Sequence, residues 1–170
     1  MSYDKFNGNY ERIFRITSIE QTETGIINSA VSSAPLATVL KTDYPEVEEA
    51  VRFNMRNDGL IEHNGVQMLQ QYILQTDPSF FKVFSFRLSK GNAATALSDP
   101  YSIVLTESTA NKYFGDIDPT GKSLTIYMND NGAGASYKIT GVMPDPPSNT
   151  HFTFNIFSSF KTMETAMTGT

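Results

Sequence analysis

The sequence predicts a mixed fold of the α+β class in two lobes. Short segments with alternating apolar residues are joined by Gly, Asn and Asp turn signals, which indicates antiparallel hairpins. Helical segments are interspersed among these hairpins instead of following every strand, which favours α+β over a parallel α/β fold. The 170 residues suffice for one ordinary domain or for two small lobes. We place the boundary between the lobes at residues 91–99.

The first predicted elements are a strand and a helix. Residues 10–19 alternate apolar and polar side chains, which predicts a strand. Residues 32–45 begin with serines that can cap a helix and carry Pro35 in the first turn. Pro45 stops the helical pattern, so we expect a helix between these limits.

A meander of three antiparallel strands follows in the sequence. Asn-Asp-Gly and His-Asn-Gly are both strong turn signals between apolar segments. We therefore expect strands at residues 47–55, 60–61 and 66–74, with turns at 57–59 and 63–65.

The middle of the chain predicts two helices around a buried strand. The order is a short helix at 78–84 capped by Asp77, a strand at 102–105, and a helix at 107–114 that Thr106 caps and Gly115 ends. A turn at 118–121 then leads into strands at 123–128, 137–143 and 152–157. After Ser158 no pattern continues, so we expect no further element.

Composition excludes several classes of protein. A net charge of -5, without any block of Lys and Arg, argues against nucleic-acid binding. The absence of cysteine excludes disulfides, thiol catalysis and cysteine-based zinc sites. No apolar run approaches the roughly 20 residues that span a bilayer, so we expect this segment to be soluble.

Gly121-Lys122-Ser123 has the last three residues of a phosphate-binding P-loop. Five residues separate Gly115 from Gly121, where a P-loop has four. A P-loop also follows a strand and opens a helix, whereas here a helix precedes and a strand follows. We expect an exposed Lys122 in a turn, and nucleotide binding stays open as a minor alternative.

Other candidate sites have structural interpretations that are stronger. His63 and His151 both lie at predicted turns, and a metal site would need a third ligand at a fixed spacing. Asp116, Asp118 and Asp145 fit turns and caps better than paired catalytic carboxylates. Residues 129–132 read Asn-Asp-Asn-Gly like the start of a calcium loop, but the pattern is not completed. We predict no catalytic, cofactor or metal residues.

The residues alone therefore point to a binding, scaffolding or force-transmitting domain. One alternative is a stand-alone ligand-binding module of the cell envelope that uses aromatic side chains. The candidates for that surface are Phe80, Phe81, Phe84 and Tyr101, although their spacing favours a core.

A series of short stretches, in order along the chain, resembles the MacB-like periplasmic core domain. They include the opening segments 2–6 and 9–15, the acidic stretch 45–52, and 76–84, 96–100, 103–110, 112–115, 118–119, 121–122 and 140–142. The residues in these stretches most resemble those of permeases from Bacteroidetes-type bacteria, in the class that includes MacB, LolC and FtsX. Lys5 and Asn7 stand where family members usually have Arg and His.

The resemblance implies the extracytoplasmic domain of an ABC transporter permease, on the periplasmic side of the inner membrane. It implies a βαβ-rich membrane-proximal lobe, here residues 1–95 and 151–170, with an inserted mixed lobe at 96–150. The implied partners are the permease's own membrane helices, a second permease copy, a cytoplasmic ATPase subunit and a periplasmic adaptor. Family domains continue with a further helix and strand, which we do not expect residues 161–170 to supply.

Overall fold

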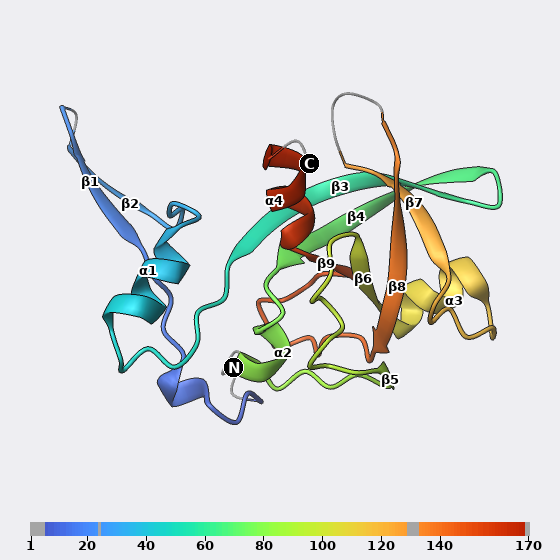
Figure 1. Cartoon of the computed structure of the whole chain (residues 1–170), viewed down its shortest axis with the longest axis horizontal. Helices are drawn as coiled ribbons and strands as arrows, with labels where there is room; N and C mark the ends of the chain where they lie inside the picture. The colour runs from blue at the N-terminus through green and yellow to red at the C-terminus, as the bar shows by residue number, and fades with distance from the viewer. Residues whose placement is uncertain (1–5, 24, 129–132, 169–170) are drawn as a thin grey trace.

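A computed structural model describes residues 6–23, 25–128 and 133–168 of the chain. Its main body is a curled sheet with the strand order β5-β8-β6-β9-β4-β3-β7 (Figure 1). A further pairing of β7 with β8 closes the sheet on itself. The strands are β3 (Phe53–His63), β4 (Val66–Thr76), β5 (Lys90–Gly91), β6 (Ser102–Thr106), β7 (Ser123–Tyr127), β8 (Ala135–Met143) and β9 (Ile156–Ser159).

The sheet is mixed, because β4 with β9 and β6 with β8 are parallel pairs. The other pairs, including β3 with β4 and β7 with β8, are antiparallel. With its few helices this sheet confirms the predicted mixture of α and β structure. The division into two lobes stays a prediction.

The long hairpin of β3 and β4 corrects the predicted meander. The turn at Asn64 and Gly65 is confirmed, with φ values of 52° and 76°. The turn predicted at 57–59 is wrong, because β3 runs through it and Gly59 pairs with Gln70 of β4. A Cβ at Gly59 would lie 2.8 Å from Cδ1 of Ile73. The glycine therefore permits close packing inside a strand, where the sequence suggested a reversal.

The segment from β6 to the end of α3 (Glu107–Phe114) follows the prediction closely. All of β6 is buried, and the Thr106 hydroxyl accepts a hydrogen bond from the Thr109 amide at the start of the helix. Gly115 ends α3 with a φ of 57°. These features depend on neighbouring residues, so the local sequence is sufficient to predict them.

Two apolar clusters form the core. One is mainly aliphatic, joins the curled sheet to helix α3 and includes Ile61, Ile73, Ile103, Leu105 and Ile139. The other is rich in phenylalanine and centres on Phe80 of the short helix α2 (Phe80–Val83), which is completely buried. The ring of Phe80 stacks on that of Phe86 at 5.4 Å. Helix α2 is thus fixed to the body by its first residue.

An N-terminal arm stands to one side of the sheet (Figure 1). We define the arm as residues 10–43: the 3₁₀ helix η1 (Tyr10–Arg12), the hairpin β1 (Ser18–Thr22) and β2 (Gly25–Ser29), and helix α1 (Leu36–Asp43). In the described residues β1 and β2 pair with each other and with no other strand. Helix α1 is confirmed, whereas the strand predicted over 10–19 is wrong: it begins as η1, and β1 starts only at Ser18.

The last described element is helix α4 (Lys161–Thr168), where the sequence predicted no element. Thr162 is buried, and Phe160, just before the helix, is also buried. Met163, Ala166 and Met167 stand at helical spacing after Phe160, so the sequence does carry a short apolar pattern that the prediction overlooked.

Candidate functional site

The stretch that resembles a P-loop forms ordinary turn and strand structure. The amide of Gly121 donates to the Ile139 carbonyl at 2.8 Å, and the amide of Lys122 donates to the Pro119 carbonyl at 2.9 Å. These N–H groups are therefore engaged with backbone and do not point at an open phosphate cradle. The Lys122 side chain is exposed, as predicted, with its ammonium 5.5 Å from the centre of the Phe114 ring.

The two histidines lie in separate settings. The ring of His63, at the end of β3, packs on Phe114 with centroids 4.5 Å apart. His151 lies on an exposed bend before β9. No group of three or more metal-ligating side chains is found among the described residues. Residues 129–132, which resemble the start of a calcium loop, lie outside them.

The three candidate aspartates also have separate surroundings. Asp118 accepts from the Thr120 amide at 2.9 Å and pairs with Lys90 at 3.2 Å. Asp145 accepts from the Ser108 hydroxyl at 2.5 Å, in the first turn of α3, where a carboxylate is favoured by the helix dipole. Asp116 is exposed. Asp118 thus belongs to a turn and Asp145 to the start of a helix, and each carboxylate has different partners.

The aromatic residues considered for a binding surface mostly belong to the core. Phe80 and Phe84 are 0% and 8% exposed, and Phe81 packs against the same cluster. Tyr101 is half-buried over the ring of Tyr137, 5.5 Å away. Burial raises the pKa of Tyr137 to about 12, with a smaller contribution from Tyr101.

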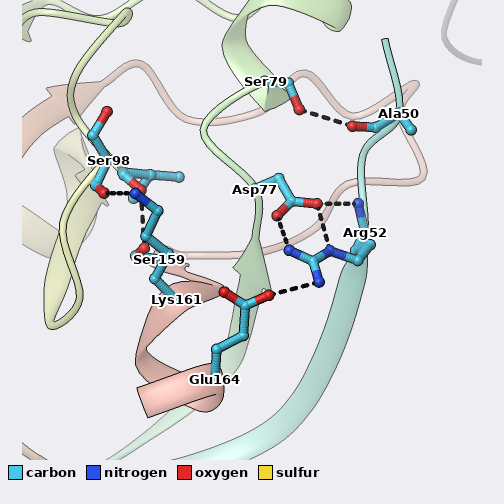
Figure 2. A network of polar contacts seen from close by, with 9 residues as sticks. Ala50, Arg52, Asp77, Ser79, Ser98, Ser159, Lys161 and Glu164 are labelled. Carbon is cyan, nitrogen blue, oxygen red and sulfur yellow. Dashed lines mark hydrogen bonds and ion pairs between the residues drawn. The ribbon is translucent and has the colours of Figure 1, made fainter. Parts of the chain in front are cut away.

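The most developed polar arrangement joins three parts of the chain at Arg52 (Figure 2). Nε and Nη2 of Arg52 donate to the two carboxylate oxygens of Asp77, at 2.9 Å and 2.7 Å. The Arg52 amide donates to the same carboxylate at 2.8 Å. Nη1 of Arg52 donates to Glu164 of α4 at 2.7 Å. We call this set, Arg52, Asp77 and Glu164, the arginine clamp.

The clamp is held in place by packing and by its own electrostatics. The guanidinium carbon of Arg52 lies 4.0 Å from the centre of the Phe160 ring, a cation–π contact. The hydrogen bonds from Arg52 to Asp77, and then to Glu164, raise the pKa of Arg52 above its usual value against the effect of burial. The guanidinium therefore stays charged, and its planar fork fixes the direction of both carboxylates.

Neighbouring hydrogen bonds extend this connection to other segments (Figure 2). The Ser79 hydroxyl donates to the Ala50 carbonyl at 2.9 Å, and the Lys161 ammonium donates to the Ser98 carbonyl at 2.6 Å. The start of β3, the end of β4, helix α4 and the loop after β5 are thereby tied to one another.

The sequence did not indicate the clamp. Asp77 was expected to cap the short helix, yet its carboxylate binds Arg52, 25 positions earlier in the chain. The contact from Arg52 to Glu164 spans 112 positions. No local spacing rule joins residues so far apart, so their pairing becomes visible only in the fold.

Comparison with known proteins gives both a family and a fold. The sequence profile described as the MacB-like periplasmic core domain matches residues 2–170. A domain of a protein described as a permease, from Porphyromonas gingivalis, is 22% identical with a TM-score of 0.68, covering 85% of this chain and 60% of that one. The periplasmic region of MacB from Actinobacillus actinomycetemcomitans is 17% identical with a TM-score of 0.54, covering 78% and 56%. No curated protein matches the chain.

The chain thus spans about 60% or less of the length of these two solved relatives. At such identities the two structures show a shared fold. Among the described residues, no helix has both the length and the apolar character needed to cross a bilayer. The match along residues 2–170 shows that the chain belongs to the MacB-like periplasmic core domain family, the periplasmic domains of ABC transporter permeases.

Proposed function

We propose that the chain is the extracytoplasmic domain of an ABC transporter permease subunit that transmits an ATP-driven conformational change to the periplasm. The process served there would be export, lipoprotein handling or another task of the cell envelope. The match of the family profile along residues 2–170 is the observation that carries this proposal.

Two features of the fold support a mechanical role. The curled sheet is closed by the β7–β8 pairing, and close-packed interiors of this kind have low compressibility and transmit strain. The arginine clamp joins α4 to the ends of β3 and β4 through charge-assisted hydrogen bonds. A displacement of α4 would therefore be passed to the sheet.

The proposal assigns ATP hydrolysis to a separate cytoplasmic subunit or domain. The remaining partners would be the permease's own membrane helices, a second permease copy or homologue, and a periplasmic adaptor protein. Binding of nucleic acid is not part of the proposal, in keeping with the net charge of -5.

Hydrogen exchange in the full-length permease, reconstituted with its ATPase, tests this function. We expect ATP to change the hydrogen-exchange rates of amides in α4, at the start of β3 and at the end of β4. An ATPase variant that binds no nucleotide should abolish the change, as the matched control. Exchange in this domain that is identical with and without ATP, in a complex that hydrolyses ATP, would contradict the proposal.

A further inference from the structure

The two ends of the N-terminal arm are attached to one short segment of the body, residues 77–85. Before the arm, the Gly8 amide donates to the Ser85 hydroxyl at 2.8 Å. The Ser85 amide in turn donates to Oδ1 of Asn7 at 2.9 Å, and Asn7 is buried. The chain thus leaves the body at Ser85.

After the arm, the chain returns to the same segment. The Ser79 hydroxyl donates to the Ala50 carbonyl at 2.9 Å, and Asp77 accepts from the amide and side chain of Arg52. Both attachments therefore belong to α2 and its flanking residues, which Phe80 anchors in the core.

The Glu49 carboxylate connects helix α1 of the arm to this segment, and a more exposed ion pair, Arg12 with Glu48, links the arm to the linker that carries Glu49. Glu49 accepts from Lys41 of α1 at 2.8 Å, and it also forms an ion pair with Lys82 of α2. The Glu49 side chain is 17% exposed, whereas those of Lys41 and Lys82 are 45% and 71% exposed. Glu49 therefore bridges a helix of the arm and a helix of the body.

A hollow lies beside this bridge. Its volume is about 460 Å³, and its walls come from α1 on one side and from the start of the α2 segment on the other. Thr38 and Thr42 line the first wall, and Pro78 and Ser79 line the second. The hollow is open to solvent, so α1 and the α2 segment are not packed directly against each other there.

We propose that residues 77–85 form a pivot from which the N-terminal arm is suspended, and that Glu49 is the latch that fixes the arm's orientation. With the latch closed, α1 is held across the hollow by the two lysines. With the latch open, the arm turns about its adjacent attachment points while the curled sheet keeps its shape.

Distance measurements between spin labels test the pivot and the latch in this chain, which has no native cysteine. One pair, Asn28→Cys on β2 and Lys138→Cys on β8, reports the arm against the body. A second pair, Arg87→Cys and Lys138→Cys, reports the body alone. All three positions are exposed.

We expect Glu49→Gln to shift and broaden the arm-to-body distance distribution and to leave the body distribution unchanged. The matched control is Glu46→Gln, which removes an exposed carboxylate from the same linker and should change neither distribution. An arm-to-body distribution no broader in Glu49→Gln than in the parent chain would overturn the latch. Equal broadening in Glu46→Gln, or broadening of the body pair, would also overturn it. None of these results requires ATP or transport, so the latch can fail while the proposed transporter function stands.

Discussion

At the scale of single residues, Arg52 is the side chain whose loss should weaken the body most clearly. It is 22% exposed, and its partner Asp77 is 13% exposed. Arg52→Ala removes the cation that pairs with the Asp77 carboxylate, which is itself largely shielded from water. We expect a loss of about 1–3 kcal/mol in the free energy of unfolding, measured by urea denaturation.

Arg87→Ala is the control for this substitution, because Arg87 is an exposed arginine of the same body. A surface change of that kind should stay within about 0.5 kcal/mol of the parent chain. Equal effects of the two substitutions would show that the clamp adds nothing to stability.

The latch residue Glu49 should respond to pH. Hydrogen bonds from Lys41 and then Lys82 lower the pKa of Glu49 below its usual value. The other charged groups nearby are Glu48 with its partner Arg12, and Arg52 with Asp77 across the hollow. Because the pKa is lowered when the latch is closed, the latch is fully present above the ordinary glutamate pKa. It is lost as the pH falls through the lowered pKa.

A titration of the Glu49 carboxyl carbon by NMR measures this pKa directly. We expect its midpoint to lie below the ordinary glutamate pKa, because Lys41 and Lys82 donate to the charged carboxylate. Lys41→Gln should move the Glu49 midpoint upward. A Glu49 midpoint at the ordinary glutamate pKa that Lys41→Gln leaves unchanged would mean that no latch forms in solution.

Prediction from sequence was successful for residues whose partners are close in the chain. Thr106 and Gly115 were assigned correctly as the start and end of α3, because the groups that they bind are within four positions. Arg52 and Asp77 were not paired, since they come together at the open end of the β3–β4 hairpin only once Phe53 pairs with Thr76, and the sequence did not predict one long hairpin there. The clamp depends on this tertiary arrangement and has no local signature.

At the scale of elements, the short strand β5 depends on a glycine. Gly91 has a φ of 92°, and a Cβ added there would lie 2.3 Å from the Thr140 carbonyl oxygen of β8. Gly91→Ala would therefore combine backbone strain with a steric clash at the β5–β8 pairing. We expect it to destabilise the chain by more than the roughly 1–3 kcal/mol that such strain alone costs.

Gly121→Ala separates these two contributions. Gly121 has a φ of 85°, but a Cβ there would meet no atom within 4 Å. In urea denaturation, Gly121→Ala should lower the free energy of unfolding by the cost of backbone strain alone. Gly91→Ala should lower it by more. A smaller loss for Gly91→Ala would show that β8 moves away from β5 easily.

The elements that sequence reasoning missed have recognisable physical causes. An Asn-Asp-Gly sequence is normally a turn signal, but at Gly59 the missing side chain makes room for Ile73 across the hairpin. Helix α4 has only a short apolar pattern, Met163, Ala166 and Met167, and it is also held to the body by the clamp contact from Arg52 to Glu164. In both cases a tertiary contact determined the structure more strongly than local preference.

At the scale of the whole molecule, we propose that residues 96–150 form an inserted lobe. This segment holds β6, α3, β7 and β8, and it is joined to the rest through the pairs β6–β9, β3–β7 and β5–β8. Native-state hydrogen exchange tests this division. If the segment is a separate lobe, the amides of its strands should exchange through one cooperative unfolding event, with a free energy different from that of β4 and β9. A single common opening for all of these strands would contradict the division.

The family and the general class of fold could be predicted from the sequence because many short stretches resemble the family in the right order. The closure of the sheet could not, because it depends on pairing β7 with both β3 and β8. Likewise, no residue pattern showed that the arm would stand beside the sheet. Its apolar side chains Ile19 and Ile26 are 73% and 69% exposed.

The central claim is that ATP moves this domain, and one distance measures that movement most directly. The full-length permease would carry Lys138→Cys as its sole label and be reconstituted with its ATPase in lipid vesicles. The distance between labels on two permease copies would then be measured with and without ATP. We predict that ATP shifts this distance, and that an ATPase variant unable to bind ATP does not. An unchanged distance in vesicles that hydrolyse ATP would contradict the account.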